Sequence, residues 1–241
     1  MLHLTDQQLL LAATERGIDI SDAALLRKAL THKSAVPNAP LESNERLEFL
    51  GDAILSQVIA TYLYDRLPAH HEGALAKARS LIVCKSALAT AATRLNITEL
   101  LWIGATEEAM GGRNRASLIA DAYEALVATI AISRGWESAR DFILRTLEPE
   151  IAAVHASEDW RDPKTTLQEI CQSAGHALPD YRIVDERGLP HDRTFVAEVR
   201  LTSGLKGQGI GKSKKEAQQA AAESVLAVLE SKPAHEAALN G

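Results

Sequence analysis

Apolar residues recur every three or four positions through most of the first 155 residues, which is the spacing of helices with one buried face. Residues that break helices, such as Gly17, Pro68 and Gly135, end several of these periodic segments. We therefore predict an all-α unit over residues 1–155. Its helices are expected at 5–16, 22–30, 44–66, 72–83, 85–95, 117–132 and 137–154, with the last one bent or interrupted at Pro149.

The periodicity changes after a polar stretch. Residues 156–162 hold three acids and precede Pro163, so we predict a linker there. The order that follows is a small α-β-β-β-α domain, predicted over residues 163–231, and no ordered element is predicted for 232–241. Its elements are expected as a helix at 164–173, strands at 180–186, 194–201 and within 204–211, and an alanine-rich helix at 213–230.

Three acids interrupt the apolar pattern in the first part of the helix expected at 44–66, over residues 44–55. Glu45, Glu48 and Asp52 fall within about 60° of one another around a helix, so their carboxylates leave on one face. We expect this helix to be mostly buried, because Leu50 belongs to its apolar stripe and Phe49 fills in beside it. Acids in such surroundings destabilise a protein unless something pairs with them, and a divalent cation is one such partner.

The segment 117–132 is a second apolar helix with acids on one face. Its only charged residues are Asp121 and Glu124, three positions apart. Salt bridges to a neighbouring arginine or lysine would explain the acids of either helix taken alone. Two apolar helices that direct carboxylates toward each other can instead build an all-oxygen site, which suits Mg²⁺ or Mn²⁺.

These segments resemble a known family. NERLEFLGDAIL at 44–55 resembles the signature of ribonuclease III, and SLIADAYEAL at 117–126 resembles the second acidic motif of that family. DPKTTLQE at 162–169, GLPHDRTF at 188–195 and GIGKSKKEAQQAAA at 209–222 resemble the motifs of the double-stranded RNA-binding domain. The resemblance covers almost the whole chain. It implies a multidomain protein, with an all-α endonuclease domain of ribonuclease III type followed by a small α+β RNA-binding domain.

The resemblance also implies an activity. The family's enzymes are Mg²⁺-dependent endoribonucleases, with Mn²⁺ a plausible substitute, and a homodimer cuts both strands of double-stranded RNA. Expected substrates are ribosomal RNA precursors and other structured transcripts, and no organic cofactor is expected. By motif, the metal-binding residues are Glu48, Asp52, Asp121 and Glu124, of which Asp52 and Glu124 are the catalytic pair.

Other positions receive supporting roles from the same resemblance. Glu45 and Glu72 are expected at the subunit contact or beside the scissile bond, and Phe49 and Leu50 are candidates for the subunit interface. The segment 111–113 matches a glycine-rich loop of the family and suits a position near phosphates. Met110 stands where a serine is usual in that loop.

The second domain is expected to read the shape of A-form RNA. By motif, minor-groove contacts fall to Thr165, Gln168, Gln172 and His191, and phosphate contacts to Lys212, Lys214 and Lys215. The lysines lie around the start of the last predicted helix, where free N–H groups also favour a phosphate. Gln218 departs from the family pattern, which often has a lysine there, so this patch carries one cation fewer.

Net charge alone argues against a polyanionic partner. The chain carries −6, with 15 Lys+Arg against 19 Asp+Glu in residues 1–157 and 11 against 13 in residues 158–241. RNA binding therefore requires a local patch, and residues 199–215 supply one, with five basic residues and no acid.

The two cysteines, Cys84 and Cys171, lie far apart along the chain, in a spacing that predicts neither a disulfide framework nor a zinc site. With no apolar run of 18 residues and no signal-peptide pattern, we expect a cytoplasmic protein without a membrane partner.

Two other classes of protein share parts of this pattern. A di-iron helical bundle also buries acids, but it uses Glu-x-x-His pairs, and neither acidic segment contains a histidine. The serious alternative is a double-stranded RNA-binding protein of the same fold that has no catalytic activity. The presence of all four acids of the implied metal site argues against that alternative.

Overall fold

The structure is a computed structural model that describes residues 4–68, 70–157, 162–189 and 192–231. It divides into two compact units, Met1–Glu158 and Asp159–Gly241. Most of the predicted linker and the whole segment 232–241 lie outside the described residues. Each unit is considered by itself below.

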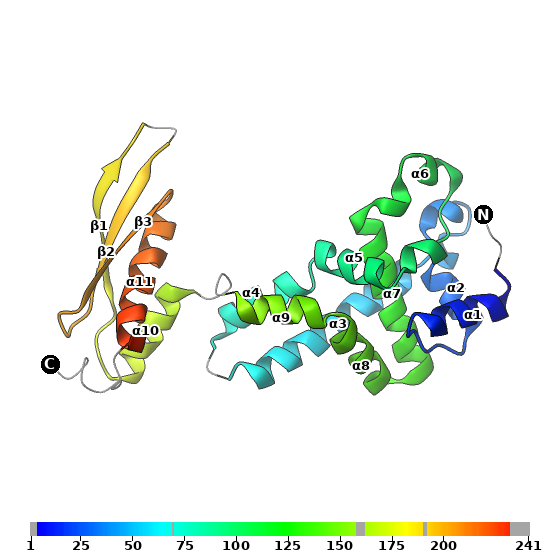
Figure 1. The fold of residues 1–241 in the computed structure, drawn as a ribbon, viewed down its shortest axis with the longest axis horizontal. Helices are drawn as coiled ribbons and strands as arrows, with labels where there is room; N and C mark the ends of the chain where they lie inside the picture. Colours follow the sequence, from blue (N-terminus) through cyan, green and yellow to red (C-terminus); the bar gives the residue numbers. More distant parts are fainter. Residues whose placement is uncertain (1–3, 69, 158–161, 190–191, 232–241) are drawn as a thin grey trace. The chain divides into compact units, whose positions relative to one another are not determined.

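The first unit is helical, as predicted (Figure 1). Short 3₁₀ turns connect several of its helices: η1 (Lys33–Ala35), η2 (Pro40–Glu42), η3 (Ile97–Leu100) and η4 (Gly112–Asn114). The helices are α1 (Asp6–Glu15), α2 (Ala23–Ala29), α3 (Glu45–Arg66), α4 (Glu72–Ile82), α5 (Lys85–Arg94), α6 (Ala105–Ala109), α7 (Ala116–Arg134), α8 (Trp136–Thr146) and α9 (Glu148–Ala156).

Helix α7 is the centre of the first unit, where it packs against α2, α3, α5 and α8 (Figure 1). Nearly every side chain from Leu118 to Ile130 is buried, as expected of a helix that is apolar on all sides. Of the helices described, α7 is the one long and apolar enough to cross a membrane, yet 67% of that stretch is buried inside the protein. It is the core helix around which the other helices are arranged.

Helix α3 is less buried than its sequence predicts. Leu47, Leu55 and Val58 face the core, but Phe49 is 81% exposed and Leu50 is 39% exposed. The prediction that Leu50 and Phe49 belong to a mostly buried helix is therefore wrong, because more of the circumference of α3 is apolar than the core of the first unit covers. Asn44 precedes the first residue of α3, and its side chain makes no capping hydrogen bond to the start of the helix.

The predicted helix 137–154 is two helices. The chain leaves helical geometry at Leu147, and Pro149 lies in the first turn of α9. Proline is well tolerated there because the first N–H groups of a helix have no partner within the helix. The interruption predicted at Pro149 therefore falls two residues earlier.

The second unit has the predicted α-β-β-β-α order. Its sheet is antiparallel in the order β1-β2-β3, with α10 and α11 against one face (Figure 1). Asp162 caps α10 by accepting a hydrogen bond from the N–H of Thr165, and Leu167 and Cys171 turn into the core. The elements are α10 (Pro163–Ser173), β1 (Asp180–Arg187), β2 (Thr194–Arg200), β3 (Lys206–Gly211) and α11 (Lys214–Ser231).

Three alternating glycines allow α11 to lie directly on β3. A Cβ atom at Gly207, Gly209 or Gly211 would come within 2.1 to 2.5 Å of atoms of α11, which is closer than any real contact. Alternate residues of a strand point to the same face, so all three glycines line the surface under the helix. The spacing of these glycines therefore sets how closely the last helix approaches the sheet.

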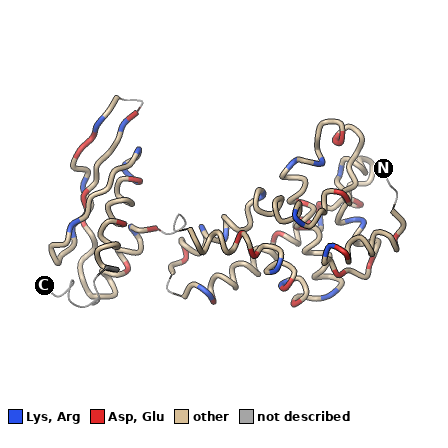
Figure 2. The backbone as a smooth tube through the Cα atoms, viewed as in Figure 1, with Lys and Arg blue, Asp and Glu red and all other residues tan. Residues whose placement is uncertain are grey.

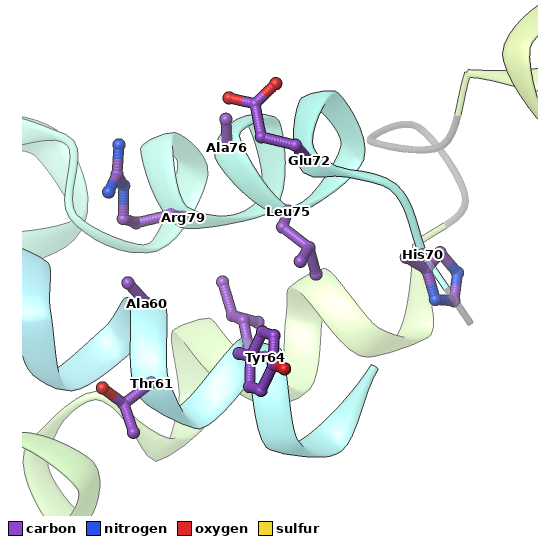
Figure 3. Close-up of a pocket in the computed structure, with 9 residues that line it drawn as sticks. Ala60, Thr61, Tyr64, His70, Glu72, Leu75, Ala76 and Arg79 are labelled. Carbon is purple, nitrogen blue, oxygen red and sulfur yellow. The ribbon is translucent and has the colours of Figure 1, made fainter. Parts of the chain in front are cut away.

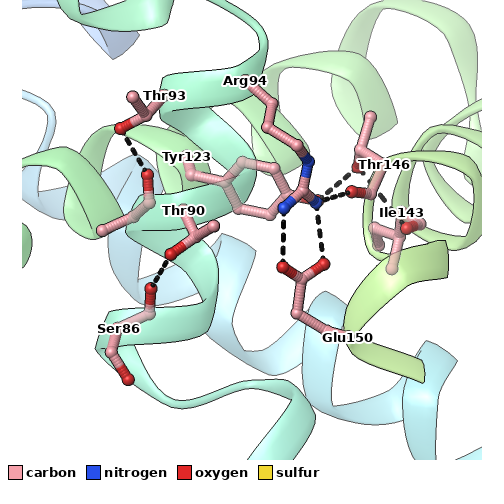
Figure 4. Close-up of polar contacts among 9 residues, drawn as sticks. Ser86, Thr90, Thr93, Arg94, Tyr123, Ile143, Thr146 and Glu150 are labelled. Carbon is pink, nitrogen blue, oxygen red and sulfur yellow. Dashed lines mark hydrogen bonds and ion pairs between the residues drawn. The ribbon is translucent and has the colours of Figure 1, made fainter. Parts of the chain in front are cut away.

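A polar network that runs from the surface into the core joins four helices of the first unit (Figure 4). The guanidinium of Arg94 on α5 donates to both carboxylate oxygens of Glu150 on α9 and to the carbonyl of Thr146 on α8, at 2.7 to 2.8 Å. The hydroxyls of Thr146 and Tyr123 lie 2.6 Å apart, and Tyr123 belongs to α7. Because Tyr123 precedes Glu124, this network fixes α7 next to an acid of the predicted site.

We expect Arg94→Met to lower the free energy of unfolding by about 1–2 kcal/mol, because it removes two hydrogen bonds to the partly buried carboxylate of Glu150 and one to the carbonyl of Thr146, although the exposed guanidinium screens part of the effect. Urea denaturation measures the change. Arg140→Met is the matched control, since Arg140 pairs only with exposed acids and its loss should change stability by less than about 0.5 kcal/mol. Equal effects of the two substitutions would contradict this account of the network.

Candidate active site

The acids of the two predicted helices meet because α3 and α7 touch backbone to backbone. Gly51 of α3 is buried, and a Cβ atom built on it would lie 1.8 Å from the carbonyl oxygen of Glu124. Only glycine permits this approach. Glu48 and Asp52 lie within one turn of Gly51 on α3, so the contact places their side chains beside α7.

Three carboxylates converge at this contact. Glu48, Asp121 and Glu124 each offer an oxygen, and these oxygens all lie within 4.8 Å of one another. Glu124 is only 7% exposed, while Glu48 and Asp121 are half-buried. Clustered carboxylate oxygens are the ligands that a hard divalent cation takes, so this part of the site can hold such an ion.

The electrostatics of the cluster fit a cation. Burial raises the pKa of Glu124 to about 7, and the negative charges of Asp52, Glu48 and Asp121 add to the increase. Burial, followed by the charge of Asp121, also raises the pKa of Glu48. Asp52 is exposed and lies outside the group of three. Its charge nevertheless raises the pKa of Glu124 more than the charge of Glu48 or Asp121 does. A divalent ion would neutralise this mutual repulsion.

Two lysines border the acids. The ammonium of Lys85, the first residue of α5, lies 3.0 Å from Oδ1 of Asp121. The ammonium of Lys33 lies 2.9 Å from Oε1 of Glu45. Neither contact was predicted from the sequence, and no spacing signal could have found Lys85, which is 36 residues from Asp121 along the chain.

The candidate RNA-binding residues lie on α10 and around the start of α11. Thr165, Gln168 and Gln172 follow one another at intervals of three and four residues, so they share one face of α10, and Gln172 is exposed. The predicted contact His191 lies outside the described residues. Lys212, Lys214 and Lys215 are the predicted phosphate contacts, and the ammonium-bearing side chains of Lys212 and Lys214 are 64% and 63% exposed.

Neighbouring acids already contact two of these lysines. The ammonium of Lys212 lies 2.6 Å from Asp192, and that of Lys214 lies 3.5 Å from Glu186. Figure 2 shows basic and acidic residues interspersed along the whole second unit. An RNA phosphate would have to compete with these acids, so the surface is less basic than its lysines alone indicate.

A further cation lies beside Gln218, the position where this chain lacks the lysine that is frequent in the family. The ammonium of Lys164, at the start of α10, donates to Oε1 of Gln218 at 2.8 Å. It also lies 4.7 Å from the centre of the Tyr181 ring. The sequence does not reveal this contact, because it joins residues 54 positions apart on different helices.

Comparison with known proteins agrees with both units. A family model described as Ribonuclease-III-like matches residues 22–151, and one described as Double-stranded RNA binding motif matches residues 163–229. The chain belongs to the ribonuclease III family. It is 42% identical over 213 residues to Ribonuclease 3 of Syntrophomonas wolfei, which covers 88% of this chain and 91% of that protein. It is also 42% identical over 225 residues to Ribonuclease 3 of Enterococcus faecalis, and this match covers 92% of this chain and 97% of that protein.

A solved structure agrees with the fold of the first unit. The nuclease domain of ribonuclease III from Campylobacter jejuni matches with a TM-score of 0.55 and 35% identity, over 58% of this chain and 96% of that one. The fold class predicted from the sequence, a helical endonuclease domain followed by a small RNA-binding domain, is confirmed.

Two acids with predicted supporting roles lie outside the group of three carboxylates. Glu45 pairs with Lys33. Glu72 begins α4 and lines a cleft of about 620 Å³ between α3 and α4, where the side chains of Tyr64 and Leu75 point toward each other (Figure 3). Their supporting roles in a ribonuclease III site stay predictions.

In this member of the ribonuclease III family, the arginines in and next to the glycine-rich loop bind other groups of the nuclease domain. Arg113 donates to the carbonyls of Thr98 and Leu101 and pairs with Glu108. Arg115 pairs with Glu107 at 2.9 Å. These contacts give both arginines a role in holding the loop in place, so the proximity to phosphates expected from the sequence is not needed to explain them.

We expect Gly51→Ala to lower the free energy of unfolding by about 2 kcal/mol or more, because the added methyl group would meet the backbone of Glu124 and force α3 and α7 apart. Separation of the helices should also weaken divalent-ion binding. Denaturation and ion titration measure the two effects. Gly73→Ala, at a helical glycine where a Cβ meets only the His71 side chain, should stay within about 1 kcal/mol of the wild type.

Glu124→Gln should stabilise the protein in EDTA at pH 8. The pKa of Glu124 rises from an ordinary 4.5 to about 7 on folding, so its ionisation destabilises the folded state as the pH rises through that interval. Glutamine removes this penalty. The free energy of unfolding of the variant should exceed that of the wild type by up to about 3 kcal/mol at pH 8, and the two should match near pH 4. Thermal unfolding across this range measures the difference, and the exposed Glu137→Gln serves as control.

Proposed function

We propose that this protein hydrolyses phosphodiester bonds of double-stranded RNA with the help of divalent ions. The convergence of Glu48, Asp121 and Glu124 at the contact of α3 and α7 is the observation that carries this proposal. Membership of the ribonuclease III family and the presence of an RNA-binding domain in the same chain support it.

Glu48, Asp121 and Glu124 would hold Mg²⁺, or Mn²⁺ in its place. When bound, such ions lower the pKa of the attacking water and stabilise the departing oxygen. Glu124 must lose its proton before it can bind a cation, and its pKa of about 7 makes ion binding tighten as the pH rises toward 8. Asp52, exposed at the edge of the group, would join these ligands through water or a second ion and form the catalytic pair with Glu124.

The second domain would bring the duplex to the nuclease domain. Thr165, Gln168 and Gln172 on α10, together with His191, would contact the minor grooves, and Lys212, Lys214 and Lys215 the phosphates between them. This arrangement reads the A-form shape over about 16 base pairs with little sequence dependence. Phosphate contacts by these lysines imply a steep salt dependence. The acids that pair with Lys212 and Lys214 compete with the phosphates, which supports a moderate affinity.

The enzyme would act as a homodimer that cuts both strands. Phe49 and Tyr64, both on α3, are 81% and 73% exposed, and such large apolar side chains on a core helix are typical of a subunit interface. Tyr64 also lines the cleft of Figure 3, so apolar surface continues from α3 toward α4. Glu45 and Glu72 would lie at this contact or beside the scissile bond. The matched nuclease domain from Campylobacter jejuni is described as flexible in a region involved in dimer formation, which supports the same assembly here.

The proposed substrates are ribosomal RNA precursors and other structured transcripts in the cytoplasm. Hydrolysis requires only water and the bound ions, so no organic cofactor has a part in the proposed reaction.

Long duplex RNA incubated with Mg²⁺ or with EDTA tests the proposal. We expect cleavage only with Mg²⁺, and Glu124→Gln should lower the rate at least about 100-fold while duplex affinity in EDTA changes less than about threefold. Lys214→Ala combined with Lys215→Ala should weaken binding and reduce its salt dependence. Gel electrophoresis follows cleavage, and a fluorescence titration measures binding.

Glu137→Gln is the control for the loss of a carboxylate outside the acid cluster. A duplex that shifts but stays intact with Mg²⁺ would favour an RNA-binding protein without catalytic activity. Acid variants that lose binding and keep cleavage would contradict the assigned roles.

A further inference from the structure

The ammonium group of Lys85 lies beside the acid cluster. The position of Lys85 within its own helix does not explain why a cation is found there. Lys85 is the first residue of α5, where the positive end of the helix dipole disfavours a cation. The preceding residue provides no side-chain cap, and the first turn of α5 contains no acid to offset the charge. Lys85 instead reaches across to Oδ1 of Asp121 on α7, at 3.0 Å.

The attraction extends beyond this one pair. Lys85 interacts electrostatically with Glu48 and Glu124 as well as with Asp121, so a single ammonium faces all three converging carboxylates. Its side chain is 60% exposed, whereas that of Asp121 is 20% exposed. The lysine therefore lies on the solvent side of the cluster and can move away without disturbing the core.

We propose that Lys85 is the built-in counter-ion of the metal-free site, and that a divalent ion must displace its ammonium from Asp121 in order to bind. This inference rests on the proposed function, because it concerns the same acids. The same interaction has two consequences. It offsets the repulsion among the carboxylates when no ion is present, and it lowers the affinity of the site for the ion.

The size of the effect follows from charge and distance. An ammonium held about 5 Å from a divalent ion repels it enough, even at the dielectric constant of water, to weaken binding by roughly tenfold. Salt and movement of the exposed side chain reduce this value, so we expect removal of the charge to tighten ion binding by about three- to tenfold.

Titration of the full-length protein with Mn²⁺ in the absence of RNA tests the inference, with free Mn²⁺ measured by electron paramagnetic resonance. Lys85→Met should lower the Kd by about three- to tenfold, whereas Lys85→Arg, which keeps the charge, should stay within about twofold of the wild type. Lys33→Met is the matched comparison. It removes an equally exposed ammonium whose hydrogen bond goes to Glu45, outside the group of three. The charge of Lys33 acts on Glu48 and Asp121 less than on Glu45, so its removal should change the Kd less than removal of Lys85, which bonds directly to Asp121.

The possible outcomes separate this inference from the proposed function. An unchanged or weaker affinity of Lys85→Met, with ion binding by the wild type intact, would overturn the role of Lys85 alone. Equal effects of Lys85→Met and Lys33→Met would overturn it too, because only general surface charge would then be acting. Failure of the wild type to bind Mn²⁺ would overturn the metal site itself and the counter-ion with it.

Discussion

The close contact between α3 and α7 at Gly51 is the constraint on which the rest of the nuclease domain depends. It brings Glu48 within reach of Asp121 and Glu124, and it leaves Glu124 almost inaccessible to water. The raised pKa of Glu124 follows from that burial and from the charges gathered around it. The packing of α7, the most apolar helix of the domain, thus offsets the unfavourable arrangement of the acids.

Much of the fold and the acidic positions were predictable because they depend on local periodicity. Helical spacing placed Glu48 and Asp52 on one face of α3, and Asp121 and Glu124 on one face of α7. Periodicity does not reveal which apolar face the core covers, so the exposure of Phe49 could not be predicted from it.

Contacts between distant segments could not be predicted in the same way. Lys85 and Lys164 reach partners on other helices, and nothing in the spacing of either residue indicates them. Arg113 binds backbone carbonyls of an irregular turn, whose directions only the fold defines. The types of residue at the site could therefore be read from the chain, but the fold was needed to find the cations that face them.

The adjacency of Glu48 and Phe49 has a mechanical consequence. Consecutive residues project about 100° apart around a helix, so α3 turns a carboxylate toward α7 and an aromatic ring toward solvent at one level along its axis. A small rotation of α3 would carry both side chains together. A contact that displaced the ring of Phe49 by turning the helix would therefore also displace the carboxylate of Glu48, because both side chains belong to the same turn of α3.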